Sequence, residues 1–389
     1  MDNTTLFSQI IRLLPREKFR NLVKELDTDK HCKGLDSWTH LVAMVFCQFG
    51  AKDSLRSICQ GLLSATGNLV HLGISSAPSK SALSYNNEHR SSELFEKFFH
   101  HIVGLYHAPK RRIGRLARIK SEIKILDSTI ISLCMKVFDW AKYRKTKGAV
   151  KMHTLIDYDS IMPQFVNITT GKKSDNKAAK DISVPKGAVV VADRGYADHK
   201  LFMHWSVIKA FFVVRIPESW KFEMITDEAI NKDLPANKNI RKAGKVKMES
   251  GKCLPEGTRL VEVWDEVNQT LIRLLTNHPS WTAATIAELY KCRWQIESLF
   301  KQIKQHLRIK SFVGTSENAL HIQIWTALIT ILLLQYLKST ATFAWHMSNL
   351  IGFIRLNLFV KINLLQWLNE PFFPPPKKPQ KSAQLKVNF

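Results

Sequence analysis

Acidic residues are scarce in this sequence. Among 389 residues there are 33 Asp and Glu against 57 Lys and Arg, which gives a formal net charge of +24. This excess of positive charge favours a polyanionic partner, with nucleic acid ahead of an anionic membrane surface. The shares of hydrophobic residues, 45%, and charged residues, 23%, are ordinary for a globular chain with two or three packed regions.

Long hydrophobic runs and paired cysteines are also missing. The most apolar run starts at Ile322, spans about 15 residues and is interrupted by Gln323 and Gln335, whereas a bilayer needs ~20. We therefore expect a buried helix there and no membrane partner, and the N-terminal residues do not have the pattern of a signal peptide. No C-x-x-C pair occurs, so the cysteines are interpreted as reduced core residues of a cytosolic protein: Cys32, Cys47, Cys59, Cys134, Cys253 and Cys292.

Residues 1–108 are predicted to be helical, because apolar residues recur there at spacings of three and four. We expect this N-terminal domain to bind DNA. Within it, Pro78 and then Ser79, a candidate N-cap, begin a polar helix. One face of this helix would read DNA bases in a helix-turn-helix, or would be an ordinary solvated surface; its residues are Ser84, Asn86, Asn87, His89 and Arg90. A basic linker follows over residues 109–122, and its cations favour contact with DNA phosphates, although charge runs are more often simply solvated.

From residue 123 the pattern changes to short β-branched runs bounded by Gly, Pro or Asp, which predict strands. Three such runs joined by tight turns, followed by alternating helix and strand, predict a mixed α/β sheet. The expected regions are the first part of this core over 123–216, a β-rich insertion over 217–280 with a basic turn region at 237–250, a helical second part of the core over 281–340, C-terminal helices over 341–370 and a flexible basic Pro-rich tail over 371–389.

Two aspartates stand where predicted strands end. Asp127 follows the apolar run "IKIL", and Asp193 follows "AVVVA" and opens "DRGY". Carboxylates in such places are held rigidly at one edge of a sheet, although a single Asp after a strand is more often a turn former or a helix cap. The latter interpretation is given to Asp157, Asp159 and Asp175.

Glu297 is the single acidic residue in the basic stretch "YKCRWQIESLFKQIKQHLRIK". On a helical wheel it lies at the border of the buried stripe, together with Tyr290, Arg293 and Lys304. A side chain at that border is anchored at its base and open at its tip, as a metal ligand or a phosphate clamp must be. The simpler alternative is a surface ion pair with Lys301 or Arg293, worth only ~0.2–0.5 kcal/mol.

Two aspartates and one glutamate can together hold two oxygen-preferring divalent cations. Mg²⁺ needs few carboxylates and keeps positions for water and phosphate oxygens. Two such ions can activate the attacking oxygen and stabilise the leaving oxygen when a phosphodiester is displaced. The surrounding cations would then bind the DNA strand.

These residues resemble a known family. The spacing Y-(2)-R-(3)-E-(6)-K is the signature of the IS-four family of bacterial insertion-sequence transposases, and it is matched here by Tyr290, Arg293, Glu297 and Lys304. Asp127 in "ILDST" and Asp193 in "DRGY" resemble the first two catalytic acids of that family, which also inserts a β-rich subdomain before its glutamate helix.

The resemblance implies a DDE transposase with an RNase H-like core and two Mg²⁺ ions, which Mn²⁺ can replace. Asp127 would bridge both ions, and Asp193 and Glu297 would each complete one site. The phosphates near the cleaved end would be bound by Tyr290, Arg293 and Lys304.

Further residues receive lesser roles from the same resemblance. Arg194 and Tyr196 of the matched "DRGY" and also Lys301 are candidates for supporting the site. Lys151 and His153 stand on a strand expected to neighbour Asp127 and would at most support the site indirectly. In relatives that form a DNA hairpin, a tryptophan of the insertion stacks on a flipped base. The candidates for that role are Trp264 and Trp220, for which packing in the core is the alternative.

The implied function is cut-and-paste transposition in the bacterial cytoplasm, at the nucleoid. The enzyme would bind the terminal inverted repeats of its element as double-stranded DNA, form a homodimer on DNA, cleave each end and join it to target DNA. Two alternatives remain: an RNase H-like nuclease without strand transfer, and a transposase remnant that binds DNA without cutting it.

Overall fold

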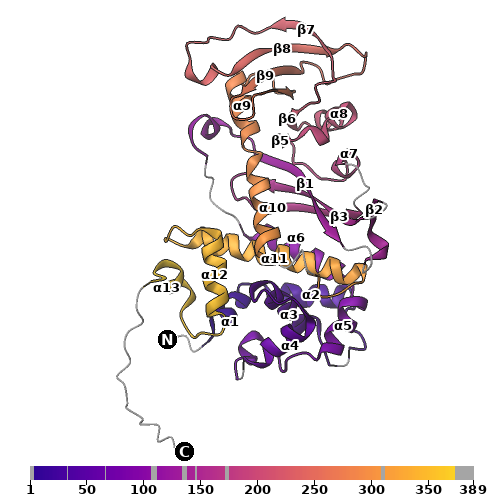
Figure 1. The fold of residues 1–389 in the computed structure, drawn as a ribbon, viewed down its shortest axis with the longest axis vertical. Helices are drawn as coiled ribbons and strands as arrows, with labels where there is room; N and C mark the ends of the chain where they lie inside the picture. Colours follow the sequence, from indigo (N-terminus) through magenta and orange to yellow (C-terminus); the bar gives the residue numbers. More distant parts are fainter. Residues whose placement is uncertain are drawn as a thin grey trace, which may run out of the picture.

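One mixed β-sheet runs through the middle and upper parts of the molecule, with helices beside and below it (Figure 1). This computed structural model describes residues 4–32, 34–65, 67–106, 112–133, 138–144, 147–170, 175–307 and 312–372. Within these residues ten strands join in the one sheet. They are β1 Ile123–Leu133, β2 Lys142–Arg144, β3 Lys147–Asp157, β4 Pro163–Thr170, β5 Val189–Ala192, β6 Phe211–Arg215, β7 Phe222–Asp227, β8 Ile240–Met248, β9 Arg259–Asp265 and β10 Thr270–Thr276.

The strand order places β1 at the centre of the core. β1 pairs antiparallel with β3, which pairs antiparallel with β4 and with the short β2. On the other side of β1, β5 and then β6 follow in parallel. The order β4-β3-β1-β5-β6 confirms the mixed α/β sheet predicted from the sequence.

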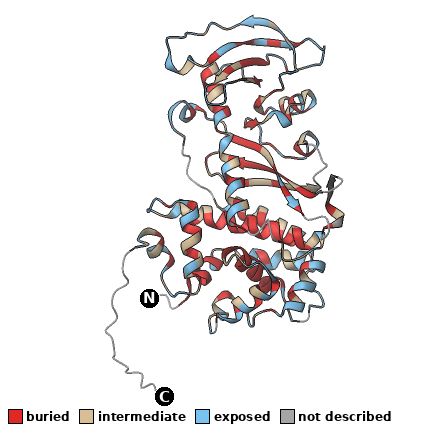
Figure 2. Ribbon diagram, in the orientation of Figure 1, coloured by how far each residue is buried: buried red, intermediate tan, exposed pale blue. Residues whose placement is uncertain are grey.

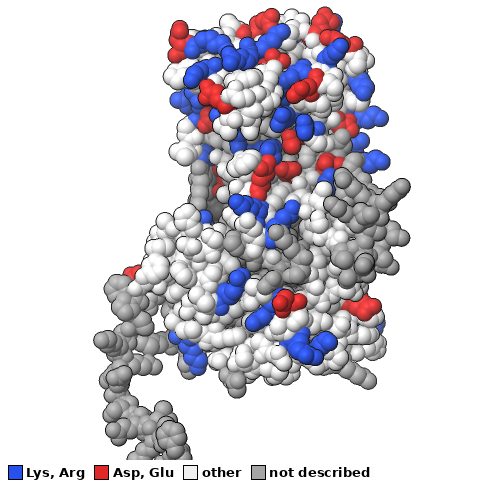
Figure 3. All heavy atoms as spheres, in the orientation of Figure 1, with Lys and Arg blue, Asp and Glu red and all other residues white. Residues whose placement is uncertain are grey.

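The β-rich segment after β6 continues the same sheet. β10 pairs antiparallel with β6, and β9, β8 and β7 follow in that order. β9 and β10 form a hairpin. The predicted turn region at 237–250 is wrong, because it contains strand β8. The cations of this stretch suggested a turn, but they lie on the exposed side of β8, while Ile240, Ala243, Val246 and Met248 are buried. Figure 3 shows Lys and Arg side chains spread over this upper end, with acidic ones among them.

Helices cover both faces of the core sheet. α7 and α8 pack on one face, while α9 and α10 share a hydrophobic cluster with the other. All four residues of β5 are consequently buried, as expected for a parallel strand between helical layers (Figure 2). The helices are α7 Asp175–Ala179, α8 His199–Val207, α9 Ala283–Lys291 and α10 Trp294–His306; short 3-10 turns are η1 Val70–Leu72, η2 Gly114–Arg118, η3 Asp139–Ala141, η4 Arg194–Tyr196 and η5 Pro235–Asn237.

A layer of helices forms the lower part of the molecule and joins both ends of the chain (Figure 1). Backbone N–H groups of Leu6 and Phe7 donate to the carbonyls of Val360 and Leu358, at 2.9 and 2.8 Å. The helices are α1 Leu6–Arg12, α2 Arg16–Glu25, α3 Ser37–Phe49, α4 Leu55–Leu63, α5 Lys80–His89, α6 Glu93–Leu105, α11 Glu317–Thr340, α12 Met347–Asn357 and α13 Leu364–Asn369.

α11 is the central helix of this layer and packs against α3, α5 and α6. By length and composition it is the one described helix that could cross a membrane, but 83% of its most apolar stretch is buried within the protein. Figure 2 shows this burial along its length. The expectation of a buried helix therefore agrees with the packing, although the helix, at 24 residues, is longer than the apolar run.

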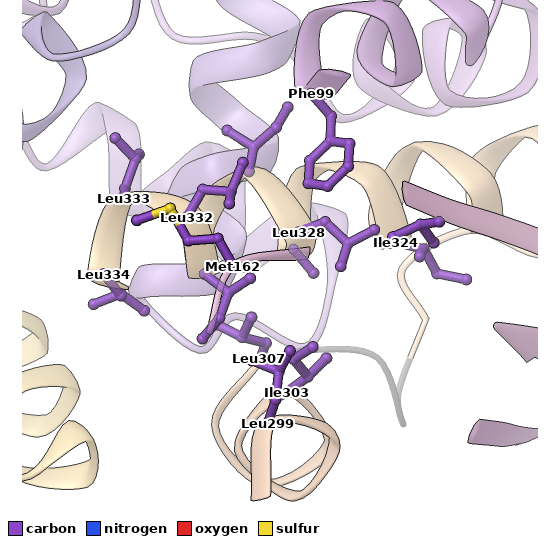
Figure 4. Packing of buried hydrophobic residues seen from close by; sticks show 14 of the residues in the cluster. Phe99, Met162, Leu299, Ile303, Leu307, Ile324, Leu328, Leu332, Leu333 and Leu334 are labelled. Carbon is purple, nitrogen blue, oxygen red and sulfur yellow. The ribbon is translucent and has the colours of Figure 1, made fainter. Parts of the chain in front are cut away.

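α10 rests on α11 through apolar side chains spaced one helical turn apart. Leu299, Ile303 and Leu307 of α10 lie in one buried cluster with Met162 and Leu328 (Figure 4). This packing fixes which face of α10 is turned to the sheet. It thereby positions the acidic residue carried by that helix.

The polar helix α5 begins as predicted, because the Ser79 hydroxyl accepts a hydrogen bond from the N–H of Ala82. The predicted base-reading face is wrong for two of its residues: Asn87 is 2% exposed and Arg90 is 5% exposed. Asn87 bonds to His40 at 2.8 Å, and Arg90 donates to His40 at 3.1 Å. Both side chains hold the helix in the domain, so they are not available to DNA.

Two cations in and next to the basic linker are also structural. The guanidinium of Arg112 donates to the Asp159 carboxylate, at 2.7 Å for its shortest contact, and both side chains are almost fully buried. Lys124 is buried between Glu122 and Asp157. Burial with a partner, not contact with phosphates, explains these two charges.

Some predictions fall outside the described residues. They concern residues 109–111 of the linker, residues 373–389 of the tail and Cys134. The other five cysteines have free thiols.

The buried histidine of the helical layer should make the protein sensitive to acid. Burial and then the charge of Arg90 lower the pKa of His40 to about 3. Below its ordinary pKa near 6.5, the unfolded chain binds a proton that the folded chain refuses. The free energy of unfolding should therefore fall by about 2 kcal/mol between pH 7 and pH 5.

Denaturant unfolding at a series of pH values measures this loss. His40→Gln should be less stable at pH 7 but should lose this part of the pH dependence. An unchanged slope in the variant would show that other groups cause the acid sensitivity.

Candidate active site

Asp127 and Asp193 lie side by side on the core sheet. In the parallel register of β1 and β5, Leu126 is paired with Ala192, so the next residue along each strand is one of the two acids. Side chains alternate between the faces of a strand. Ile125, two residues before Asp127, belongs to the core cluster shared with α9 and α10. Both carboxylates therefore face these two helices.

The prediction that Asp127 ends its strand is wrong, because β1 continues to Leu133. Its neighbour β3 goes on pairing past this point, with Thr154 opposite Asp127. β5, by contrast, ends at Ala192. Asp127 is thus a mid-strand residue at the point where the adjacent strand stops, which holds its backbone more firmly than a strand end would.

The glutamate lies on a helix that is interrupted. The helical wheel treats the stretch from Tyr290 to Lys304 as one continuous helix, but α9 ends at Lys291 and α10 begins at Trp294. Between them, the N–H groups of Cys292 and Arg293 donate to carbonyls three residues earlier, so the chain tightens for one turn. Tyr290 nevertheless remains beside Arg293, whose guanidinium carbon lies 5.7 Å from the centre of the tyrosine ring.

The guanidinium of Arg293 lies between Asp127 on the sheet and Glu297 on α10. One nitrogen of its guanidinium is 3.2 Å from an Asp127 oxygen, and another is 2.6 Å from a Glu297 oxygen. The hydroxyl of Tyr290 lies 3.4 Å from an oxygen of Asp193. The three acids therefore lie close to Tyr290 and Arg293, two further residues of the Y-R-E-K signature.

The charges of the acids affect one another. Burial above all, with smaller contributions from the neighbouring charges of Asp193 and Glu297, raises the pKa of Asp127 to about 6, against the opposing effects of the Ser128 N–H and Arg293. Three carboxylates with this mutual repulsion require a cation among them. In this structure the guanidinium of Arg293 supplies that positive charge.

The donor set fits divalent metal ions in its chemistry. Carboxylate oxygens are the ligands that Mg²⁺ and Mn²⁺ prefer. Within the described residues, however, no three acidic, histidine or cysteine side chains converge closely enough to hold an ion as they stand. The guanidinium lies between Asp127 and Glu297, so its displacement is required before these two carboxylates can share an ion.

The other predicted site residues differ in how far they are buried. Lys304 is half-buried, and being seven residues beyond Glu297 on α10 it shares the same helix face. Arg194 is exposed, whereas Tyr196 is 1% exposed and lies where burial and the charges of Asp175 and Asp127 raise its pKa. Lys301 is exposed; Glu297 forms its ion pair with Arg293 instead.

A cleft of about 1170 Å³ opens beside the acids, between α9, the start of α10 and the inserted strands. Tyr290 and Arg293 line it from the helices, and Trp264 lines it from β9. The indole of Trp264 is half-buried under the guanidinium of Arg241, 5.8 Å from its centre. Both signs of charge occur on the cleft wall, which also includes the cations Arg115, Arg215 and Lys291 and the acids Asp265, Glu266 and Glu288.

The structure changes the interpretation of two tryptophans. Trp220 packs against Phe202 and Phe222 away from this cleft, at centroid distances of 6.2 and 6.3 Å. Trp294, which the sequence interpretation overlooked, is 66% exposed and lines the cleft directly after Arg293. The clue was its place on the polar side of the helix, where a large aromatic side chain has no packing reason to be.

A mixed sheet with adjacent carboxylates, a helical glutamate and a cleft beside them defines a class of protein: an α/β enzyme of phosphodiester chemistry. Comparison with known proteins agrees. Residues 118–333 match the family described as "Transposase DDE domain". Residues 2–75 match a family described as "Domain of unknown function (DUF4372)".

Individual relatives carry similar names. The y4zB protein of Sinorhizobium fredii, named as a transposase, is 32% identical over 261 residues, which are 67% of this chain and 71% of that one. A protein of Synechocystis sp., named as the transposase of insertion sequence element IS4SA, is 29% identical over 275 residues, covering 67% and 74% of the two chains. A structure of the piggyBac transposase in a synaptic complex with hairpin DNA aligns with a TM-score of 0.45 at 10% identity, over 96% of this chain and 81% of that one.

The chain belongs to the DDE transposase family, because the family domain covers more than half of its 389 residues. This confirms the resemblance seen in the Y-R-E-K signature. Enzymes of this family cleave DNA and transfer its strands with divalent metal ions.

Metal binding should be visible as a gain in stability. At a free Mn²⁺ concentration about 100 times the dissociation constant, an ion held by the three carboxylates should stabilise the folded protein by about 2.7 kcal/mol. Asp127→Asn, Asp193→Asn and Glu297→Gln should each lose most of this gain in thermal unfolding.

Asp157→Asn is the matched control, because Asp157 is a half-buried carboxylate on β3 with its own lysine partner, Lys124. It should retain the full gain. Equal loss in the control and in the three variants would mean that Mn²⁺ stabilises the protein elsewhere.

Proposed function

We propose that this chain is the transposase of a bacterial insertion sequence that moves by cut and paste. It would act at the nucleoid on double-stranded DNA, cleaving at the terminal inverted repeats of its element and joining the freed ends to target DNA. The observation that carries the proposal is that Asp127 and Asp193 directly follow Leu126 and Ala192, the last residue pair of the parallel strands β1 and β5, and lie close to Glu297 of α10.

The catalytic core is of the RNase H-like type. The support for this is the strand order β4-β3-β1-β5-β6, with β3 and β4 antiparallel and β5 and β6 parallel to the central β1. The inserted strands β7 to β10 extend this core at β6 before the chain returns in α9 and α10. The acids sit on the central strand, the strand beside it and the returning helix.

Asp127, Asp193 and Glu297 would hold the metal ions of the reaction, which would be Mg²⁺ or Mn²⁺. When bound, such ions lower the pKa of the attacking water or 3′-hydroxyl and stabilise the leaving oxygen. The chain itself contributes rigidity: Asp127 is fixed in a paired strand, and α10 is fixed by its packing on α11. No covalent bond between protein and DNA is needed.

Tyr290, Arg293 and Lys304 bind phosphates next to the cleaved bond. Arg293 has a double role, because its guanidinium neutralises Asp127 and Glu297 in the structure without DNA. A phosphate in the cleft offers the same guanidinium a bidentate partner of similar geometry. A metal ion competes with the guanidinium for the two carboxylates, and a phosphate that binds the guanidinium makes this exchange more favourable. Arg194, Tyr196 and Lys301 support this centre without touching the reacting atoms.

The tryptophans of the cleft stack on an unpaired base of the DNA end. Trp264 and Trp294 line the same cavity as Arg293 from opposite walls, one from the insertion and one from α10. An indole face gives roughly 1–3 kcal/mol per stacked base without reading its identity. Trp294, with its large exposed area, meets the DNA first.

The helical N-terminal domain contributes contacts to the inverted repeats. On α5 the exposed side chains left for such contacts include Lys80, Ser84, Tyr85 and His89, of which Tyr85 and His89 are stacked at 4.2 Å between ring centres. A homodimer on DNA would hold the two ends of the element together, as concerted cleavage of two ends requires.

The direct test uses DNA that carries the inverted repeats bracketing this gene, incubated with protein and Mg²⁺ or Mn²⁺. Glu297→Gln, Asp127→Asn and Asp193→Asn should each reduce cleavage and joining by at least about 100-fold, the scale on which one charge-stabilising group acts. DNA affinity in gel shifts should remain within about threefold, since the acids do not bind phosphate.

Glu93→Gln is a matched control for Glu297→Gln. Both residues belong to i,i+4 ion pairs on helices, and Glu93 pairs with Lys97 at 3.1 Å far from the cleft. It should cleave normally. Cleavage without any joined product would favour the plain nuclease, and DNA binding without cleavage by the wild type would favour the remnant.

A further inference from the structure

A second charged cluster lies behind the catalytic acids, on the opposite face of the sheet. Its centre is Asp175, the first residue of α7. One carboxylate oxygen of Asp175 accepts a hydrogen bond from the Ser128 hydroxyl at 2.7 Å, and the other accepts from the Lys151 ammonium at 2.8 Å. The ring of His153 lies 3.4 Å from the first oxygen.

These partners are arranged by the sheet itself. Ser128 of β1 is directly opposite His153 of β3 in the antiparallel register, and Lys151 is two residues from His153 on the same side of its strand. His153 is fully buried and also bonds to Thr169 of β4 at 3.1 Å. Two strands therefore converge on one carboxylate, and a third strand holds the histidine.

The cluster is coupled to Asp127 through a single residue. Ser128 follows Asp127 in the chain, and its backbone N–H donates to the Asp127 carboxylate at 2.7 Å. The hydroxyl of the same serine is bound by Asp175. Ser128 is thus held from behind while it orients the acid in front.

The cluster also meets the turn that carries Asp193. A Cβ atom on Gly195 would lie 3.3 Å from an oxygen of Asp175, so the backbone of η4 lies close against this carboxylate. η4 begins directly after Asp193, whose own carboxylate accepts from the Arg194 N–H at 2.7 Å. Asp175 therefore touches both the segment after the first acid and the segment after the second.

Asp175 is held in its charged form. Burial opposes ionisation, but hydrogen bonds from His153, Lys151 and Ser128 outweigh it and lower the pKa of Asp175 to about 2. A buried charge with three donors has a fixed position, because any movement would leave donors unpaired.

We propose that Asp175 is a positioning residue for the catalytic acids. From the far face of the sheet it fixes Ser128 and the η4 turn, and thereby sets the separation of Asp127 and Asp193 that a shared pair of metal ions needs. The assignment rests on the proposed function of these acids as metal ligands. Asp175 itself contacts neither metal nor DNA. Residues that orient metal ligands typically change metal affinity or activity by about 10–100-fold when they are removed.

The test compares Asp175→Asn and Ser128→Ala with Asp157→Asn in the full-length protein. Asp157 is matched to Asp175, because it also accepts from a serine hydroxyl, of Ser160, and pairs with a buried lysine on a neighbouring strand. Mn²⁺ affinity is measured without DNA by electron paramagnetic resonance, and cleavage, DNA affinity and thermal unfolding are measured alongside.

Asp175→Asn should bind Mn²⁺ about 10–100-fold more weakly and should cleave correspondingly more slowly, with DNA affinity unchanged. Ser128→Ala should move in the same direction by a smaller factor, and it keeps the pair of Asp175 and Lys151, so it remains informative if Asp175→Asn does not fold. Asp157→Asn should lose thermal stability but keep wild-type Mn²⁺ affinity and cleavage.

Wild-type Mn²⁺ affinity in folded Asp175→Asn or Ser128→Ala would overturn the proposal, as would equal weakening in Asp157→Asn. Failure of the proposed function would have a different result, namely wild-type protein that cleaves no DNA. The Mn²⁺ comparison would still decide the role of Asp175, because it requires no DNA.

Discussion

Repulsion between carboxylates is the constraint around which this molecule is organised. The parallel register of β1 and β5 places Asp127 beside Asp193, and α10 adds Glu297 opposite them. Burial makes this grouping unfavourable unless positive charge enters it. Arg293 supplies that charge from the same helix that supplies the third acid. The packing of α10 on α11, the tight turn after α9 and the shape of the cleft keep one cation and three anions close to each other.

Much of this site could be predicted from the sequence, because its members stand in patterns that chemistry restricts. Asp127 and Asp193 follow apolar runs. The signature from Tyr290 to Lys304 is recognised by its spacing in the sequence, which the break in the helix between Tyr290 and Arg293 does not change. What the sequence could not provide was the partner of each charge. Asp175 looked like an ordinary helix cap, and its three partners lie 22 to 47 positions away in the chain. Arg90 and Arg112 looked like DNA contacts, and only the folded chain brings Asp29 and Asp159 to them.

The fold was predicted best where periodicity carries the signal and worst where charge conceals it. β5 and β6 are apolar on both faces and were predicted as strands, whereas β8 alternates cations with buried residues and was taken for a turn. The same difficulty applies to α5, in which polar residues serve both surface and interior. Asn87 and Ser84 are alike in sequence terms, yet one is buried against His40 and the other is exposed.

The joining of the two chain ends has a consequence for synthesis. α3 lies buried against α11, and the first helix hydrogen-bonds to backbone beyond residue 357, so the N-terminal layer lacks its central helix until most of the chain has left the ribosome. Contacts this distant in sequence form late in folding. A prematurely terminated polypeptide would therefore lack a finished helical layer.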